Sequence, residues 1–375
     1  MTLSAIIGWG KDPVVNAIEF TIEPEKAIGI AVATIGTLGL GYMAATVPWK
    51  HYAMRIAQAT PYFIQEREKF ERELEDQNFC DIDCSKVITA IPSEGSAKES
   101  ILSRLSTIKG KSGNGKNSGA VYIENPDLDN LINQVNALAI RTNPLHLSLC
   151  PDLRCLETEV VAMTASLFNG DLSVRGNVTT GGTLSILHAV YTARERAKKE
   201  FRIQSGSQMI VPSTAHPAFD KAAEMFNIKI VRVPVHPKGH PEAFKADVDA
   251  MIGAITSKTI FMAGSFPSFP HGMIDPIDKL SDRLEDVDPQ GKIGLHLDAC
   301  LGGFCLPFIN KSNALAHLEM PIGFANSRVT SISADTHKYG YDKKGSSIIL
   351  YRDEEWYQHQ IFTTTTWSGG IYTSP

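Results

Sequence analysis

The sequence predicts an α/β protein in which a largely parallel β-sheet is covered by helices on both faces. Short apolar segments rich in β-forming residues recur in the second half of the chain, at 209–211, 228–233, 259–263, 293–297, 329–332 and 347–351. Helical patterns lie before or between them, at 126–141, 155–168 and 183–201 and from Ala218 onward. This alternation is typical of buried parallel strands, and such sheets bind their ligands at the carboxyl ends of the strands.

The composition is that of a globular protein. Of the 375 residues, 43% are hydrophobic and 21% are charged, and the net charge is -5. A negative net charge gives no support for a nucleic-acid partner. The six cysteines are too few and too scattered for a secreted disulfide scaffold, and Cys80 and Cys84 lack the second pair that a zinc site needs. We therefore expect reduced thiols and no bound metal.

Residues 27–49 contain no charged side chain. A helix of this length would cross the roughly 30 Å of hydrocarbon in a bilayer, although a buried helix of a soluble protein is the alternative. Acidic residues precede the run and basic residues such as Lys50 and Arg55 follow it, so the positive-inside rule places the rest of the chain in the cytosol. We predict a lumenal segment over residues 1–26 and a transmembrane helix over 27–49.

Residues 50–118 are predicted to form a connecting region. A charged amphipathic helix is expected at 55–78, and Ser96 with Glu99 forms a capping box that starts a short helix ending near residue 108. The Gly-, Ser- and Lys-rich stretch 109–119 is expected to be a loop. It lacks the spacing of a phosphate-binding P-loop, and no strand precedes it.

The apolar strand predicted at 329–332 runs into a polar turn that carries Lys338. A lysine in such a turn can form a Schiff base with an aldehyde cofactor when burial or a nearby charge lowers its pKa. The strand at 293–297 likewise ends beside a carboxylate, Asp298. Pyridoxal phosphate needs an acidic partner of this kind, because its ring takes up electrons when the pyridine nitrogen is protonated.

Two further features complete the set that a pyridoxal-phosphate site requires. Gly181, Gly182 and Thr183 open a helix, and the free N–H groups of a helix N-terminus bind phosphate. His216 follows the strand at 209–211, where an imidazole can stack on the cofactor ring. Each feature alone is common as a turn, a cap or a polar core residue. Their occurrence together is much more specific.

Several longer sequence motifs also occur along the chain. They are NPLH from Asn143, SLFNG from Ser166, FPHG from Phe269, HLDACLGGF from His296, TSISADTHKYGY from Thr330, KGSS from Lys344 and WSGGIYTSP from Trp367. In these motifs the chain resembles the sphingosine-1-phosphate lyases, which are pyridoxal-phosphate enzymes related to the group II amino-acid decarboxylases. Generic decarboxylases share the aspartate and the His–Lys pair, but not the whole run KYGYxxKGSS.

The resemblance covers residues 119–375 and implies the aspartate-aminotransferase-like fold of pyridoxal-phosphate enzymes, fold type I. It implies a homodimer with the site at the interface. It also implies an endoplasmic reticulum membrane anchor with the catalytic part in the cytosol. Enzymes of this fold continue with a small carboxyl-terminal domain, so we expect that this domain is missing and that the chain is a fragment or a short form.

The resemblance also implies a lyase of sphingolipid metabolism, which cleaves a phosphorylated sphingoid base to a long-chain aldehyde and phosphoethanolamine. Lys338 would hold the cofactor with His337 beside it, and Asp298 would bind the ring nitrogen. His216 would stack on the ring. The cofactor phosphate would lie on Gly181, Gly182 and Thr183, and the residues implied near the substrate or a phosphate are Asn143, His146 and Lys344.

Two alternatives stay open. The chain could be a pyridoxal-phosphate-dependent amino-acid decarboxylase, or a truncated, inactive membrane-anchored chain with only an interaction role. Leu184 also departs from the resemblance, because the family usually has a glutamate at this position of the phosphate turn. Since the phosphate contacts come mostly from the backbone, we expect cofactor binding to survive this change.

Overall fold

A computed structural model describes residues 94–106, 125–143, 150–311 and 322–375. Contacts divide the chain into two units, residues 1–108 and 109–375, which are described separately. In the first unit, the short helix predicted after Ser96 is confirmed as α6, Lys98–Ser106. Several predicted features lie outside the described residues and stay predictions: the transmembrane segment 27–49, the helix 55–78, the pair Cys80 and Cys84, the loop 109–119, and His146.

Within the described part of the chain, no helix combines the length and the apolar character that crossing a bilayer requires.

The second unit is built on a seven-stranded mixed sheet with the strand order β1-β7-β6-β5-β4-β2-β3. The strands are β1 (Arg175–Thr179), β2 (Gln208–Pro212), β3 (Lys229–Val233), β4 (Thr259–Ser265), β5 (Gly294–Asp298), β6 (Val329–Ala334) and β7 (Ser347–Tyr351). All neighbours from β3 to β6 are parallel, and β7 runs antiparallel between β6 and β1. The prediction of a largely parallel sheet is therefore confirmed, with one strand reversed.

Strand β1 is the one member of this sheet that the sequence patterns do not predict. Its sequence, RGNVT, contains a single strongly apolar residue, Val178, so neither an apolar run nor an alternation marks it. It forms a strand because it pairs in register with β7 along its whole length. The tertiary partner, rather than local propensity, decides its conformation.

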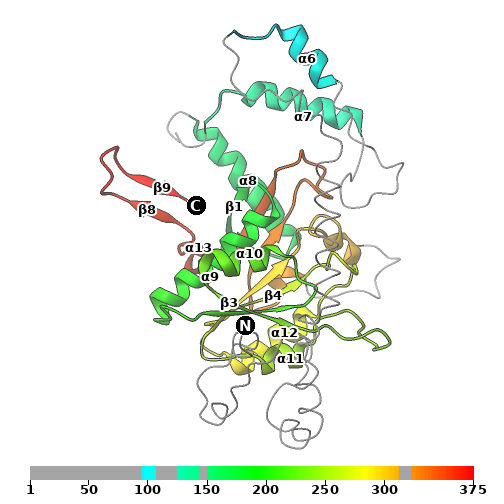
Figure 1. Ribbon diagram of the computed structural model, residues 1–375, viewed down its shortest axis with the longest axis vertical. Coiled ribbons are helices and arrows are strands. Elements are labelled where there is room, and N and C mark those ends of the chain that lie inside the picture. Colours follow the sequence, from blue (N-terminus) through cyan, green and yellow to red (C-terminus); the bar gives the residue numbers. More distant parts are fainter. Residues whose placement is uncertain (1–93, 107–124, 144–149, 312–321) are drawn as a thin grey trace, which may run out of the picture. The chain divides into compact units, whose positions relative to one another are not determined.

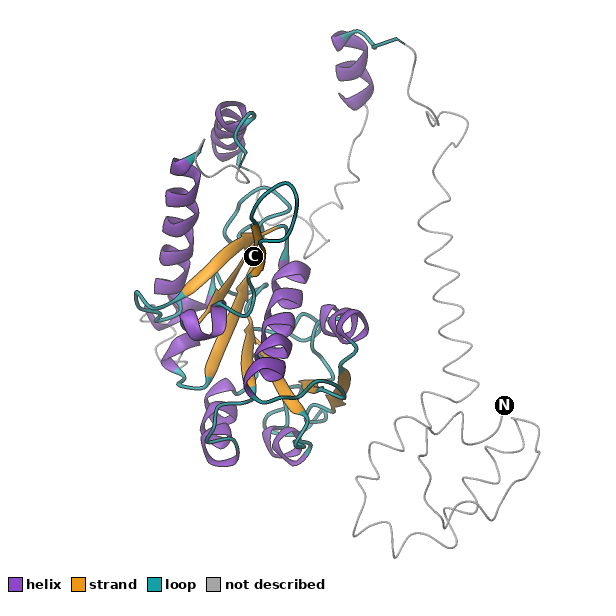
Figure 2. Ribbon diagram, turned by 90° about the vertical axis from the view of Figure 1, so that its left-hand side faces the viewer, coloured by secondary structure: helices purple, strands orange, loops and turns teal. Residues whose placement is uncertain are grey.

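Helices cover both faces of the sheet (Figure 1 and Figure 2). One face packs against α9 (Gly182–Glu200) and α10 (Ala218–Phe226), and the other against α8 (Pro151–Leu167), α11 (Val248–Gly253) and α12 (Ile277–Val287). Alternate strand residues divide between the two cores. In β7, Ile349 and Tyr351 join the core under α9, whereas Ile348 and Leu350 join the opposite core. The sheet is therefore buried on both faces, as predicted.

The other described elements of the second unit are smaller or lie outside this sheet. They are α7 (Pro126–Ala139), η2 (Leu306–Lys311), η4 (Gly323–Ala325), α13 (Glu354–Tyr357) and the two-stranded antiparallel sheet of β8 (Phe362–Thr364) and β9 (Tyr372–Ser374). Helix α7 begins where the Asn125 side chain accepts hydrogen bonds from the Asp127 and Leu128 amides. A side-chain cap of this kind satisfies N–H groups that have no partner within the helix.

Arg328 ties the end of α12 to the start of β6. Its guanidinium donates to the backbone oxygens of Leu284 at 2.7 Å and Asp288 at 2.9 Å. It also pairs with the Asp288 carboxylate at 2.8 Å, and only 12% of the Arg328 side chain and 7% of the Asp288 side chain are exposed. Removing one member of such a pair leaves a buried charge without its partner.

We expect Arg328→Ala to lower the free energy of unfolding by about 3 kcal/mol, because the buried Asp288 carboxylate loses its cationic partner and two backbone oxygens each lose one of their donors. Arg283→Ala is the matched control, since the pair of Arg283 with Asp249 is exposed, with 46% and 81% of the two side chains accessible. The control should cost less than about 1 kcal/mol. Chemical denaturation measures both variants, and equal losses would contradict the assigned role of Arg328.

Candidate active site

One edge of the sheet gathers the ends of several strands. Strands β1, β4, β5 and β6 finish at this edge, and β7 begins there because it runs in the opposite direction. The turns that follow line a cavity of about 490 Å³. Its lining includes these residues predicted from the sequence: Gly181, Gly182, Thr183, His216, Asp298, His337 and Lys338. The structure therefore brings together side chains that are far apart in the sequence.

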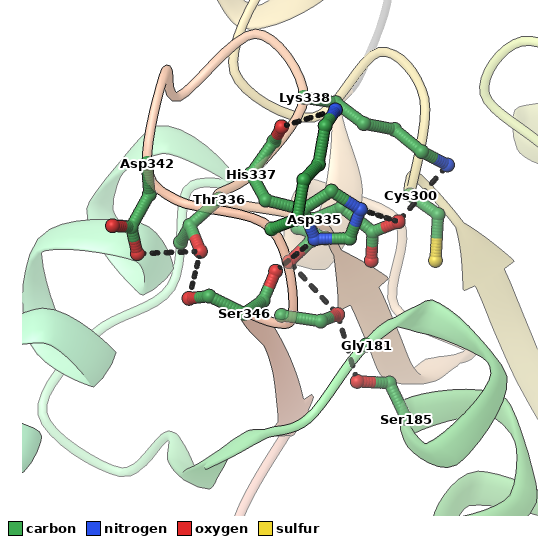
Figure 3. Close-up of polar contacts among 12 residues, drawn as sticks. Gly181, Ser185, Cys300, Asp335, Thr336, His337, Lys338, Asp342 and Ser346 are labelled. Atoms are coloured by element: carbon green, nitrogen blue, oxygen red, sulfur yellow. Dashed lines mark hydrogen bonds and ion pairs between the residues drawn. The ribbon is translucent and has the colours of Figure 1, made fainter. Parts of the chain in front are cut away.

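Lys338 forms an ion pair with Asp335 at the carboxyl end of β6 (Figure 3). The distance from Lys338 Nζ to Asp335 Oδ2 is 2.9 Å, and 22% of the lysine side chain and 3% of the aspartate side chain are exposed. Burial by itself lowers the pKa of Lys338. The neighbouring Cys300, Asp335 and Asp298 outweigh burial and raise this pKa above its ordinary value. The lowered pKa expected of a reactive lysine is therefore not found in this structure, because the carboxylates favour the ammonium form.

The turn that carries Lys338 is held by hydrogen bonds at its base (Figure 3). The Thr336 hydroxyl bonds to the Ser346 hydroxyl, and the His337 backbone N–H donates to the Ser346 carbonyl oxygen at 3.3 Å. His337 Nδ1 also contacts that oxygen, so this nitrogen carries the proton. His337 Nε2 lies 3.8 Å from Asp335 Oδ2. The turn thus presents His337 and Lys338 to the same carboxylate.

The turn before α9 approaches this carboxylate closely, and glycine makes the approach possible. Gly181 has φ +148°, a conformation that other residues rarely adopt. A Cβ on Gly182 would lie 2.7 Å from both Asp335 Oδ1 and Cys300 Sγ, whereas a Cβ on Gly181 would meet nothing within 4 Å. No side chain caps the N-terminus of α9. Its first N–H groups lie beside the cavity, where an anion can bind them.

Buried hydroxyl groups fix α9 to the strand edge. Ser185 Oγ lies 2.7 Å from Thr179 Oγ1 and 2.9 Å from Ser347 Oγ. Ser347 Oγ in turn donates to the carbonyl oxygen of Ala334 at 3.2 Å. This chain of hydroxyls runs from the end of β1, through α9, to the end of β6. It therefore holds the Gly181–Gly182 turn at a set position relative to the lysine turn.

Asp298 and His216 line the same cavity from two further elements. Asp298 ends β5, and its Oδ1 accepts a hydrogen bond from the Cys300 backbone N–H at 3.2 Å. Among the described residues, no donor reaches its Oδ2. His216 precedes α10, and its Nδ1 accepts from the Ala218 amide at 3.1 Å. That hydrogen bond fixes the plane of the imidazole ring and leaves Nε2 as the protonated nitrogen.

The three residues predicted to lie near the substrate or a phosphate differ in where the structure places them. Lys344 Nζ donates to the His337 carbonyl oxygen at 3.3 Å, and burial together with the nearby Lys338 lowers the pKa of Lys344. Asn143 is exposed and does not line the cavity. His146 lies outside the described residues. The structure therefore places Lys344 beside the lysine turn and does not bring Asn143 to it.

Three titratable residues of the cavity lining were not predicted from the sequence: Asp335, Cys300 and Lys221. Asp335 could have been found, because it precedes Lys338 by three residues in the same turn. Cys300 follows Asp298 by two residues and is buried, and burial raises its pKa well above the ordinary value. Lys221 lies on α10, and no local signal distinguishes it from a solvated helix lysine. Leu184, in contrast, was noted in the sequence, and it lines the cavity as an apolar residue.

These residues fit pyridoxal phosphate. The open space at Gly181 and the uncapped start of α9 suit the phosphate group. The space beside Gly182 exists because this residue has no Cβ, which would fill it. Asp298 Oδ2 is available to the ring nitrogen, and Lys338 supplies the amine for the aldehyde. Asp335 Oδ1 is buried beside the cavity without a hydrogen-bond partner among the described residues, and a polar group of a bound ligand would supply one.

We expect Gly182→Ala to weaken the binding of pyridoxal 5′-phosphate by at least about tenfold, because the added methyl group displaces Asp335 and Cys300. Gly253→Ala is the control, since a Cβ at Gly253 meets nothing within 4 Å. Quenching of intrinsic fluorescence measures both affinities. Unchanged affinity in Gly182→Ala would show that the close approach at this turn does not matter for the cofactor.

Sequence comparisons identify a protein family and several similar proteins. Residues 111–367 match the pyridoxal-dependent decarboxylase conserved domain. A sphingosine-1-phosphate lyase from Oryza sativa subsp. japonica is 42% identical over 301 residues, which cover 78% of this chain and 53% of the relative. Sphingosine-1-phosphate lyase 1 of Mus musculus is 41% identical over 318 residues, which cover 83% of this chain and 53% of the relative. The chain therefore spans about half the length of these relatives.

Solved structures agree with the sequence comparisons. A sphingosine-1-phosphate lyase from Burkholderia pseudomallei superposes with a TM-score of 0.69 at 34% identity, covering 77% of this chain and 66% of that protein. A glutamate decarboxylase from Lactobacillus brevis has a TM-score of 0.62 at 20% identity, covering 77% and 65%, and this likeness shows the fold alone. The resemblance to the lyases and the use of pyridoxal phosphate are thus confirmed. The chain belongs to the pyridoxal-dependent decarboxylase family.

Proposed function

We propose that this chain forms the cofactor-binding part of a carbon–carbon lyase, which cleaves phosphorylated sphingoid bases to a long-chain aldehyde and phosphoethanolamine. The observation that carries the proposal is the cavity in which Lys338, Asp335 and Asp298 converge. The identity of 42% and 41% to two sphingosine-1-phosphate lyases supports this substrate class. Because the chain spans about half of those relatives, the complete activity is part of the proposal.

Pyridoxal phosphate, when bound, would supply an electron-withdrawing ring that can take up the electron pair of a breaking C2–C3 bond. Lys338 must lose a proton before its amine can bond to an aldehyde. Asp335 Oδ2, at 2.9 Å from the amine, is placed to accept that proton. Asp298 would favour a protonated ring nitrogen through its charge. His216, with its ring oriented by the Ala218 amide, would lie against the cofactor ring.

Proton transfer to and from the substrate falls to the lysine turn. His337 Nδ1 is occupied by the Ser346 carbonyl oxygen, so Nε2 is the atom of this ring that can exchange a proton. Lys344 supplies a positive charge beside the same turn, which suits a phosphate group of the substrate. Asn143 and His146 are proposed as further contacts to substrate, through the resemblance alone.

We also propose a homodimer and an anchor in the endoplasmic reticulum membrane through residues 27–49, with the catalytic part in the cytosol. The uncharged run and the basic residues after it support the anchor. The exposed side chains of Trp367 and Ile371, between β8 and β9, support a partner surface there, since 58% and 76% of these residues are accessible.

A pyridoxal-phosphate-dependent amino-acid decarboxylase is the second candidate, because the matched domain is described as that of pyridoxal-dependent decarboxylases. The two candidates differ in product. The lyase releases a long-chain aldehyde from a phosphorylated sphingoid base, whereas the decarboxylase releases carbon dioxide from an amino acid. The inactive membrane-anchored chain is the remaining alternative, and it predicts neither product.

We expect borohydride reduction of the full chain with pyridoxal 5′-phosphate to attach the cofactor to Lys338, as read by peptide mass spectrometry. Lys338→Arg keeps the positive charge beside Asp335 but cannot lose it to react, so the label should disappear and aldehyde release should fall by more than about 1,000-fold. Labelling at a different lysine would contradict the site. Carbon dioxide release from amino acids, without aldehyde, would replace the lyase by the decarboxylase.

We expect Lys344→Met to raise the KM for a phosphorylated sphingoid base about tenfold, because a charge-assisted contact to phosphate is lost. The unphosphorylated base should be cleaved at an unchanged rate. Lys343→Met is the control, since the amine of this neighbouring lysine donates instead to Asn136 Oδ1 at 3.0 Å. Equal effects of Lys344→Met on the two substrates would show that Lys344 does not recognise the phosphate.

A further inference from the structure

Strands β5 and β6 bring four polar side chains to one face of the sheet. In their parallel register, His296 lies opposite Ser331 and Asp298 lies opposite Ser333. Residues two positions apart on a strand point to the same face, so the four side chains lie together. Phe219 of α10 packs edge-on against the His296 ring at 6.1 Å between centroids, which identifies this face as the one covered by α9 and α10. We call the four side chains the β5–β6 polar row.

Hydrogen bonds connect the polar row from end to end. His296 Nδ1 lies 2.9 Å from Ser331 Oγ, and His296 Nε2 lies 3.1 Å from Ser333 Oγ. The Ser333 hydroxyl reaches Asp298 Oδ1 at 3.4 Å, the longest contact of the row. Hydrogen bonds in active sites are often long before a ligand is bound. The histidine ring is therefore the bridge between the two serines, and Ser333 is the bridge to the carboxylate.

Burial makes these contacts the main partners of the groups involved. His296 and Ser333 are 0% exposed and Ser331 is 2% exposed, whereas Asp298 is 8% exposed. Asp298 is also the one member of the row that lines the cofactor cavity. Burial lowers the pKa of His296 to about 3, so the ring is neutral at physiological pH. A neutral imidazole has one donor nitrogen and one acceptor nitrogen.

The Asp298 carboxylate determines which atoms of the β5–β6 polar row donate and which accept. An ionised Asp298 only accepts, so the single Ser333 proton points to Oδ1. Ser333 Oγ then accepts from His296 Nε2–H, and also from the Cys300 thiol at 3.2 Å. His296 Nδ1 is left as the acceptor for the Ser331 hydroxyl. Every donor points toward Asp298, and the reverse tautomer of His296 would take the Ser333 proton away from the carboxylate.

We propose that His296 and Ser333 are positioning residues, which hold Asp298 Oδ1 through the β5–β6 polar row and leave Oδ2 turned to the ring nitrogen of pyridoxal phosphate. The Cys300 backbone N–H shares Oδ1 with the row at 3.2 Å, so one oxygen is held by the protein while the other faces the cavity. This inference rests on the cofactor-binding part of the proposed function and is independent of the substrate. It assigns a role to two residues that do not line the cavity.

The test measures the dissociation constant of pyridoxal 5′-phosphate and the rise in melting temperature that the cofactor causes, with the full chain. Ser333→Ala removes the donor to Asp298. Thr330→Val is the matched control, because it deletes a hydroxyl of the same strand that donates to the Leu295 carbonyl oxygen at 3.2 Å instead. We expect Ser333→Ala to raise the dissociation constant about tenfold and to reduce the cofactor-induced rise, whereas Thr330→Val should change the constant less than about twofold.

His296 variants and a double-mutant cycle separate positioning from packing. His296→Leu should match Ser333→Ala, and His296→Gln, whose amide can still donate to Ser333, should recover most of the affinity. In an Asp298→Ala background, Ser333→Ala should have no further effect, because its acceptor is gone. If His296→Leu does not fold, the serine variants decide the question.

The inference is overturned if Ser333→Ala and Thr330→Val give the same dissociation constant. It is also overturned if Ser333→Ala weakens binding equally with and without Asp298, since its effect would then be structural. Failure of the unaltered chain to bind pyridoxal 5′-phosphate would remove the proposed function and this inference together. Normal binding by the unaltered chain, with no effect of Ser333→Ala, would remove the inference alone.

Discussion

Asp335 directly follows β6 and carries a carboxylate of which 3% is exposed, and a charge so deeply buried needs a partner. Lys338 Nζ provides that partner at 2.9 Å, which fixes the lysine at the cavity and favours its charged form. The same carboxylate requires a glycine at position 182, where a Cβ would lie 2.7 Å from Oδ1. The phosphate turn, the lysine turn and the strand edge therefore depend on one another through this single side chain.

The second carboxylate of the cavity, Asp298, has a different environment. Asp298 is bonded on one oxygen by the Cys300 amide and by Ser333, and among the described residues no cation forms an ion pair with it. Asp335 therefore governs the amine at one part of the cavity, whereas Asp298 is available to the cofactor ring nitrogen. Two acids in one site are kept distinct by what each accepts. The β5–β6 polar row connects Asp298, but not Asp335, to buried side chains on one face of the sheet.

The fold explains why such a site can be built at all. Because β7 begins where β1, β5 and β6 end, residues from positions 179 to 347 meet at one edge. Hydroxyls of Thr179, Ser185 and Ser347 fasten that edge to the start of α9. Helices pack on both faces of the sheet, so the strands that hold the site are buried between two cores. The match to the family model shows the family and the use of pyridoxal phosphate. Cleavage of a phosphorylated sphingoid base is the activity that we propose, because the chain spans about half the length of the lyases that it resembles.

The sequence by itself determined the features that are local. Apolar runs identified β2 to β7 in the sheet, and the motifs around Lys338, Asp298 and Gly181–Gly182 identified the cofactor. Both kinds of signal depend only on residues that are adjacent in the chain. It did not determine β1, whose sequence RGNVT carries no strand pattern and pairs only because β7 is beside it. Nor did it determine the raised pKa of Lys338 or the alignment of His296 with Ser333. Those properties depend on the register of strands and on burial, which exist only when distant segments pack together.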